Sequence, residues 1–361
     1  MKAVYLHIPF CQTICSYCDF CKMYYRPELV TSYLEVLNNE IKSTYHGEII
    51  ETIYIGGGTP SSLSITELKQ LMAIIKTFKK TDNYEFTFEC NIENIDYDKL
   101  MLLYQNGVNR LSIGIQTFNL KLLKDLNREH SEDEVIGKIK MAKKIGFNNI
   151  SIDLIYAIPN ETMSDVQKDL LKFLKLDINH IATYSLIIEP NTKLYINKTK
   201  PLDDELDFNM YQLIRNTLTE NGFNHYETSN FAKPGAESKH NLTYWNNEQY
   251  YGFGLGASGY LNGTRYENTR SINHYLEGKY RLEEHVLSKE DDMENHMILG
   301  LRQLKGVNKG EFEKRFDIKI KDAFQIDKMI NEGKLIEDEN NLFIADKYIY
   351  LANEILVNFI K

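Results

Sequence analysis

The chain has 361 residues, of which 43% are hydrophobic and 26% are charged, as is ordinary for a soluble globular protein with more than one domain. Its formal net charge of -9 argues against a surface built to neutralise phosphates, so no nucleic-acid partner is expected. No apolar run approaches the length of a membrane-spanning helix, and the N-terminal segment lacks a signal-peptide pattern, so a cytoplasmic, reducing location is expected.

Up to about residue 190, compact β-branched runs alternate with amphipathic helical patterns. Such runs are typical of buried parallel strands. Six β/α units in succession predict an α/β fold, a partial (β/α)6 TIM-like barrel with its chemistry at the carboxyl ends of the strands. The predicted strands are 3–7, 52–55, 85–89, 110–115, 149–155 and 180–186, and the predicted helices are 27–41, 65–79, 97–105, 132–145 and 164–174.

Beyond residue 190 the pattern changes. Residues 203–221 predict one long helix, and a stretch rich in Tyr, Asn and Gly follows it. From residue 293, short helical patterns precede a terminal hairpin (335–337 and 342–345), an order that resembles a winged-helix module. Its acidic character favours a packing or lid role over DNA reading. The expected domains are the barrel (1–190), a helical and Gly/Tyr-rich extension (191–290) and an α+β, winged-helix-like end (291–361).

Four of the five cysteines lie in one segment directly after the first predicted strand, at Cys11, Cys15, Cys18 and Cys21. In a large chain of a reducing compartment this crowding indicates a metal or cluster site. The C-x3-C-x2-C spacing of the first three lets one loop wrap three thiolates round an iron–sulfur cubane, leaving its fourth iron open. The alternative is a closed zinc site with Cys21 as the fourth ligand, although such sites usually draw cysteine pairs from separate knuckles.

Glycines and polar residues follow the ends of the next predicted strands. Three consecutive glycines, Gly56 to Gly58, would let backbone amides approach a ligand closely, although they could also form only a tight turn. Single polar residues at the later strand ends are each more often structural than functional, but a ligand at the barrel mouth would reach all of them. Cys90 is expected to be a small buried hydrophobe. The polar candidates are Glu89, Gln116, Arg128 and Asp153.

The segment from His7 to Cys18, HIPFC-x3-C-x-YC, resembles the cluster loop of the radical S-adenosylmethionine superfamily. Within it, the branch of oxygen-independent coproporphyrinogen III oxidase and the HemW haem-chaperone family is the most similar. The resemblance implies a [4Fe–4S] cluster on Cys11, Cys15 and Cys18, whose open iron binds S-adenosylmethionine. It also implies contacts of Tyr5, Gly57 and Glu89 with that molecule, and it matches Gly58, Thr59, Gln116, Arg128 and Asp153 to contacts with a second S-adenosylmethionine of the oxidase.

Two features separate the branches. The oxidase carries C-x3-C-x2-C-G-C and a long N-terminal extension, whereas here Asp19-Phe20-Cys21 follows Cys18 and the first predicted strand begins at residue 3. Both departures predict that coproporphyrinogen III oxidase activity is absent. Residues 240–245, HNLTYW, match the HNxxYW motif of HemW, in which His240 could ligate haem iron beside aromatic side chains. The alternative is that His240 is a hydrogen-bonded structural residue.

The resemblance therefore implies a cytoplasmic haem chaperone with a [4Fe–4S] cluster and S-adenosylmethionine. It would bind haem and hand it to haem-requiring apoproteins such as respiratory enzymes, with membrane contact only through such partners. The alternatives are the oxidase itself, which would decarboxylate coproporphyrinogen III, and a radical enzyme that acts on another substrate.

Overall fold

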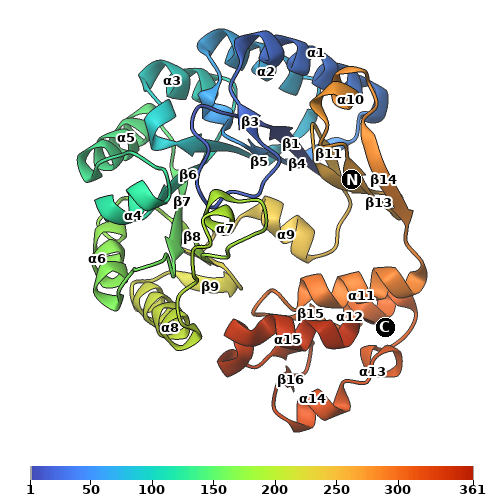
Figure 1. The fold of residues 1–361 in the computed structure, drawn as a ribbon. Helices are drawn as coiled ribbons and strands as arrows, with labels where there is room; N and C mark the ends of the chain where they lie inside the picture. The colour runs from blue at the N-terminus through green and yellow to red at the C-terminus, as the bar shows by residue number, and fades with distance from the viewer. Residues whose placement is uncertain (1, 361) are drawn as a thin grey trace.

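The computed structural model describes residues 2–360 and contains a curved 12-stranded sheet with helices along its outer side (Figure 1). At the centre of this sheet six parallel strands follow one another in chain order, each joined to the next by a helical connection. This arrangement confirms the partial (β/α)6 barrel. The six strands are β1 (Ala3–Ile8), β4 (Ile49–Gly57), β5 (Lys79–Asn91), β6 (Arg110–Gln116), β7 (Asn149–Tyr156) and β8 (His180–Ser185).

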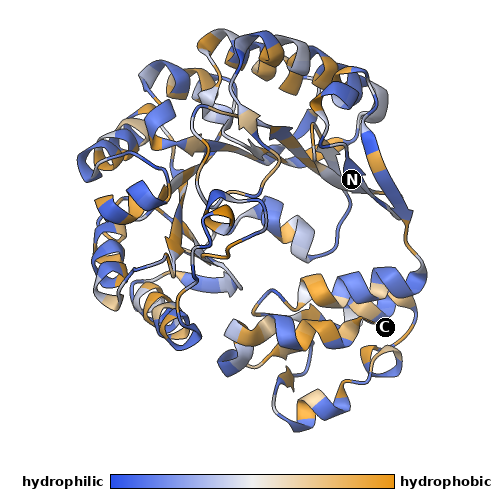
Figure 2. Cartoon of the chain, in the orientation of Figure 1, coloured by the Kyte–Doolittle hydropathy of each residue, from blue (hydrophilic) through white to orange (hydrophobic). Residues whose placement is uncertain are grey.

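Several of the connecting helices begin at capping boxes. Ser64, Ser131 and Thr162 each accept a hydrogen bond from the backbone N–H three residues later, where an acidic side chain bonds back to the cap. The helices lie close to their predicted ranges, and their polar sides face outward from the more hydrophobic strands (Figure 2). They are α1 (Pro27–Thr44), α2 (Ile65–Ile75), α3 (Tyr97–Gln105), α4 (Leu120–Asp125), α5 (Glu132–Ile145) and α6 (Met163–Phe173).

The end of the predicted helix 65–79 was wrong. Helix α2 ends at Ile75, and Lys79 instead begins β5, where it pairs with Ile49 of β4. A turn that buries Phe78 joins the two elements, with its backbone N–H bonded to Ile75. Apolar residues therefore continue through the turn without a break in the sequence pattern, which hid the helix end.

The sheet extends past the barrel at both edges. Beyond β8 lie β10 (Asn230–Ala232) and β9 (Asn224–Glu227), after the long helix α8 (Asp204–Glu220) that the sequence predicted. At the other edge β11 (Tyr250–Phe253) runs parallel to β1 and continues into three antiparallel strands. The domain boundary at residue 190 stays a prediction, and strands from both sides of it share this sheet. The three further strands are β12 (Ser258–Leu261), β13 (Thr264–Asn268) and β14 (Arg281–Val286).

A buried carboxylate ties α1 to this extension of the sheet. Glu40 is fully buried, and it accepts hydrogen bonds from the Gly254 backbone N–H at 2.9 Å and from the Tyr275 hydroxyl at 2.7 Å. The Asn268 amide donates at 2.7 Å, and the Arg281 guanidinium lies 3.2 Å away. Tyr275 belongs to α10 (Ile272–Leu276), so one side chain joins three elements. A buried charge is tolerated only with such a full set of partners.

Residues 293–359 form a separate hydrophobic cluster below the barrel in Figure 1. It contains short helices and a small sheet in the order β15-β17-β16, which confirms an α+β region with the predicted terminal hairpin. Within residues 2–360, no helix combines the length and apolar character needed to cross a membrane. The elements are α11 (Lys289–Gly300), β15 (Val307–Asn308), α12 (Lys309–Phe316), α13 (Ile320–Ala323), α14 (Asp327–Asn331), β16 (Leu335–Glu337), β17 (Asn341–Ile344) and α15 (Ala352–Leu356).

Candidate functional site

A cavity of about 420 Å³ runs through the barrel. Its lining includes the cysteine loop and the carboxyl ends of the strands, and it reaches Arg110 and His180, the first residues of β6 and β8. Three predicted residues, Tyr5, His240 and the alternative ligand Cys21, are not part of the lining. The predicted residues that line it are Cys11, Cys15, Cys18, Gly57, Gly58, Thr59, Glu89, Gln116, Arg128 and Asp153.

The cysteine loop is held in place by backbone contacts. At its base β2 (Phe10–Cys11) pairs with β3 (Met23–Tyr24), which closes the loop on itself. At its tip the Asn127 side-chain amide donates to the Ile14 carbonyl at 2.8 Å, and the Ser16 backbone N–H donates to Leu126 at 3.0 Å. These contacts of the chain itself therefore fix the shape of the loop at its base and at its tip.

Two of the three predicted ligand thiols have a hydrogen-bond donor beside them. The Thr59 hydroxyl lies 3.4 Å from the Cys11 sulfur, and an Arg128 nitrogen lies 3.9 Å from the Cys15 sulfur. Burial raises the pKa of Cys11 to about 11, so this thiol would release a proton when it binds a metal. Three sulfur ligands beside an open cavity fit a cluster with one free iron. Among the described residues, no three His, Cys, Asp or Glu side chains are placed to hold a single metal ion.

Cys21 occupies a different environment from the three cavity thiols. It packs against Gly256, where an added Cβ would lie 3.0 Å from its sulfur. The His7 Nε2–H donates to the Cys21 carbonyl at 2.6 Å, so His7 Nδ1 accepts from the Tyr5 hydroxyl at 3.0 Å. Burial lowers the pKa of His7 to about 4, which keeps the ring neutral in this role. His7 and Tyr5 thus support the loop from beneath, and the geometry does not supply the four converging thiols of the zinc alternative.

The three consecutive glycines are required by their neighbours. A Cβ at Gly56 would lie 2.8 Å from the Glu89 carboxyl carbon, and one at Gly58 would lie 2.8 Å from the Cys11 sulfur. Gly57 has φ +123°, and its backbone N–H donates to Glu89 at 3.1 Å. The segment therefore brings backbone against both the cysteine loop and a carboxylate, which a simple turn would not need.

Glu89 and Asp153 face the cavity with raised pKa values. Burial is the main cause in both, and it brings the pKa of Glu89 to about 7 and that of Asp153 to about 6. Glu89 accepts from the Tyr54 hydroxyl at 2.7 Å, whereas Asp153 has only a 3.5 Å contact with the Ser112 hydroxyl. Both carboxyls can accept from the ammonium or hydroxyl groups of a polar ligand.

Gln116 and Arg128 differ in how fully they are bonded. Arg128 donates to Asn91, Glu93 and the Gly114 carbonyl, and it is 6% exposed, so it is already fixed by the protein. Gln116 is also 6% exposed, but its side-chain oxygen has no hydrogen-bond partner, and its backbone is left-handed at φ 72°. A strained backbone and an unpaired buried oxygen at the cavity are features of a ligand-binding position.

His240 has the hydrogen bonds expected of a structural histidine, the alternative to a haem ligand. It lies on α9 (Lys239–Trp245) with 1% exposure, Nδ1 bonded to the Thr52 hydroxyl at 2.9 Å and Nε2 bonded to the Tyr244 hydroxyl at 2.7 Å. Burial lowers the pKa of His240 to about 3, so the ring is neutral. Both nitrogens are occupied, and in this conformation neither can bind iron. The role of His240 as a haem ligand stays a prediction that would require its ring to leave Thr52 and Tyr244.

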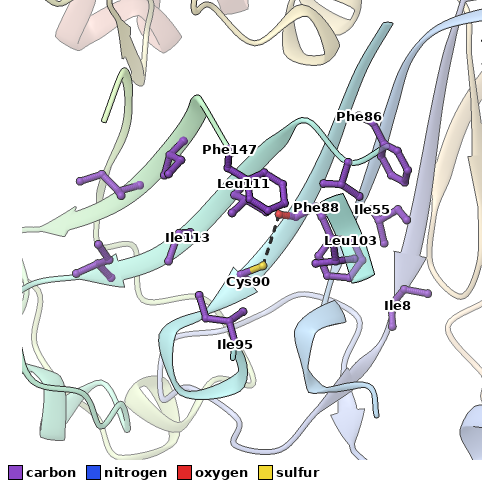
Figure 3. Packing of buried hydrophobic residues seen from close by; sticks show 14 of the residues in the cluster. Ile8, Ile55, Phe86, Phe88, Cys90, Ile95, Leu103, Leu111, Ile113 and Phe147 are labelled. Carbon is purple, nitrogen blue, oxygen red and sulfur yellow. Dashed lines mark hydrogen bonds between the residues drawn. The ribbon is translucent and has the colours of Figure 1, made fainter. Parts of the chain in front are cut away.

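Several cavity residues were not predicted from the sequence. Many follow the period of two along the predicted strands, so they face the same side as Glu89, Gln116 and Asp153. Cys90 was expected to be a buried hydrophobe, and this is confirmed, since it is 3% exposed and packs in the core near Ile95 and Ile113 (Figure 3), although it also borders the cavity. The cavity residues missed include Tyr54, Asn91, Arg110, Ser112, His180, Tyr184, Asn230 and Asn241.

Two family models match the chain. One describes the radical SAM superfamily and matches residues 5–173, and the other describes the HemN C-terminal domain and matches residues 287–347. In fold, the chain is similar to the structure of coproporphyrinogen III oxidase (HemN) from Escherichia coli. The TM-score is 0.88 at 22% identity, over 99% of this chain and 90% of that one.

Curated relatives are similar over their whole length. "Heme chaperone HemW" of Lactococcus lactis is 43% identical, over 99% of this chain and 97% of that protein. The Bacillus subtilis protein of the same name is 38% identical, over 100% of this chain and 99% of that protein. The Escherichia coli protein of the same name is 30% identical, over 99% of this chain and 98% of that protein. The chain belongs to the HemW family of the radical SAM superfamily.

Proposed function

We propose that the chain is a cytoplasmic haem chaperone that binds haem and transfers it to haem-requiring apoproteins, such as respiratory enzymes. The observation that carries this proposal is its full-length similarity to relatives named "Heme chaperone HemW". The fold alone does not distinguish the proposal from the oxidase, because the oxidase shares that fold. Contact with a membrane would come only through the recipient proteins.

In this proposal Cys11, Cys15 and Cys18 hold a [4Fe–4S] cluster, and the cavity beside them binds S-adenosylmethionine. The bound pair supplies one-electron chemistry. The glycine segment presents the Gly57 backbone to the cavity, and Glu89 offers a carboxylate to a ligand ammonium or hydroxyl. The remaining predicted contacts, Gly58, Thr59, Gln116, Arg128 and Asp153, line the same cavity, whereas Tyr5 acts through His7 beneath the loop.

A haem titration of anaerobically reconstituted protein tests the proposal. We expect the Soret band to saturate at about one haem per chain. We expect His240→Ala to lower the melting temperature and to leave the haem affinity nearly unchanged. The ring is hydrogen-bonded to Thr52 and Tyr244, and losing such buried hydrogen bonds costs about 1–3 kcal/mol. A large loss of haem affinity in this variant would instead show that the ring rearranges and binds the iron.

Absence of saturable haem binding in the wild type would overturn the proposed function. The matched assay is anaerobic conversion of coproporphyrinogen III by the same preparation, for which we expect no product. Product formation without haem binding would favour the oxidase.

The affinity for S-adenosylmethionine should rise with pH. Because the pKa of Glu89 is about 7, its carboxyl is protonated below that pH and becomes an accepting anion above it. Calorimetric titrations from pH 6 to pH 8 should therefore show tighter binding at the alkaline end. Glu89→Gln cannot ionise, so the part of the pH dependence that disappears in this variant belongs to Glu89. An identical pH profile in both proteins would show that Glu89 does not bind the ligand as an anion.

A further inference from the structure

The floor of the cavity contains a buried cation that no carboxylate of the described residues approaches to ion-pair distance. Arg110 lies at the start of β6, lines the cavity and is 2% exposed. Its one protein hydrogen bond, to the Thr87 hydroxyl, is long at 3.5 Å, and its Nε has no partner. No ion pair with Arg110 is found within residues 2–360. A buried guanidinium in this state is costly, and it is normally paired with an anion.

The carboxylates of the cavity do not fill this role. Glu89 is held by the Tyr54 hydroxyl and the Gly57 backbone N–H, and Asp153 is nearest to the Ser112 hydroxyl. Each influences Arg110 only from beyond ion-pair distance. An anion that pairs with Arg110 must therefore come from outside the chain.

Helix α9 lies within the arc of the sheet (Figure 1), and the charge of Arg110 acts on His240 of this helix, where it helps to lower the pKa after the larger effect of burial. Glu85, on β5, accepts from the first two backbone N–H groups of this helix, at Lys239 and His240. The next residue, Asn241, lines the cavity, and no partner of its side-chain amide is found among the described residues. The HNxxYW motif thus uses its histidine to fix the helix, whereas its asparagine faces the ligand space.

A second amide, that of Asn230, lies higher in the cavity, where Asn230 pairs with Ala182 at the level of Asp153. Asn230 lies on β10 with 3% exposure, lines the cavity and has a buried side-chain oxygen without a partner. Because this oxygen can only accept, the donors free to bind an anion within residues 2–360 are those of Arg110 and Asn241, which we call the polar floor. Unpaired buried groups of this kind indicate a ligand or ordered water.

We infer that this polar floor binds the carboxylate of a ligand that enters the cavity. A planar guanidinium matches a carboxylate with two parallel hydrogen bonds, and the Asn241 amide can donate a third. The carboxylate would come either from a propionate of haem or from the amino-acid group of an S-adenosylmethionine that is not bound at the cluster. This inference rests on the proposed function, because it takes the cavity to be the ligand site.

The test is a pair of titrations, with S-adenosylmethionine and with haem, of wild type, Arg110→Met and Asn241→Ala. We expect Arg110→Met to weaken one of the two ligands by about 10- to 100-fold, as for the loss of a charged hydrogen bond. Haem dimethyl ester, which has no free carboxylates, distinguishes the sources. If Arg110 binds a haem propionate, the ester should bind wild type and Arg110→Met with equal affinity. If Arg110 binds the carboxylate of S-adenosylmethionine, the haem affinity of Arg110→Met should equal that of the wild type.

Arg265→Met is the matched control, since Arg265 also has an unpartnered Nε but lies outside the cavity. It should bind both ligands as the wild type does. Asn241→Ala removes no side-chain hydrogen bond found among the described residues, so it should fold. If Arg110→Met fails to fold, the same two titrations of Asn241→Ala test the inference, and we expect weaker binding of one ligand. The inference is overturned if the variants bind both ligands like wild type, or lose both equally. A wild type that binds neither ligand overturns the proposed function itself.

Discussion

Replacing Cys15 by alanine should abolish the [4Fe–4S] absorbance of the reconstituted protein, and replacing Cys21 should leave it in place. Cys15 lines the cavity beside an Arg128 nitrogen, whereas Cys21 packs against Gly256 outside it. With three protein ligands for one cubane, the loss of any one removes a third of its protein ligands, and we expect the cluster to be lost. The readout is the iron and sulfide content of each variant after anaerobic reconstitution.

Cys90→Ala serves as the control for removing a cysteine, because Cys90 also borders the cavity but lies on β5 in the hydrophobic core and not on the cysteine loop. It should retain the cluster content of the wild type. Loss of the cluster in Cys21→Ala, with Cys15→Ala unaffected, would mean that the loop uses a different set of thiols. Zinc bound at one ion per chain under the same conditions would also contradict the cluster.

Replacing Glu40 by alanine should lower the free energy of unfolding by about 3–5 kcal/mol. The side chain is fully buried, and its removal takes the acceptor from Asn268 and Tyr275 and one of the two carboxylate partners from Arg281. The contact between α1 and the outer strands of the sheet would weaken with it. Urea denaturation followed by far-ultraviolet circular dichroism measures the change.

Glu35→Ala provides the comparison on the same helix, because Glu35 is exposed. This surface change should stay within about 0.5 kcal/mol of wild type. Equal stability of the two variants would show that the Glu40 network contributes little. Glu40→Gln should fall between them, since an amide oxygen still accepts from Tyr275 but no longer offsets the Arg281 charge.

The barrel could be predicted because its signals are local. Each strand contains a short buried run, and the helices that follow, except α1, begin at a side-chain cap such as Ser131 that the sequence shows directly. The same regularity placed Glu89, Gln116 and Asp153 at strand ends, and the structure gathers all three round one cavity. Arg110 shares the cavity face of β6 with Ser112 and Gly114, but a register shift between Gly114 and Gln116 breaks the alternation of side chains, so the spacing from Gln116 did not indicate it.

The outer strands and α9 were harder to predict for physical reasons. Strands β11 to β13 have four or five residues each and contain glycine or tight turns, so their pairing depends on partners distant in the chain. The contacts of His240 likewise come from Thr52, 188 positions away. No local sequence pattern reveals such a partner. A histidine next to aromatic residues has the same sequence pattern whether it binds iron or has a structural role.

The pairing of β1 has a consequence for the order of biosynthesis. The first strand to leave the ribosome lies between β4 and β11, so its second neighbour is made only when Phe253 has been translated. The cysteine loop that follows β1 packs on Gly256, close behind that strand. Contacts of such long range form late. Iron–sulfur assembly on this chain should therefore follow synthesis of nearly the whole sheet, and a nascent chain halted before β11 should accept no stable cluster.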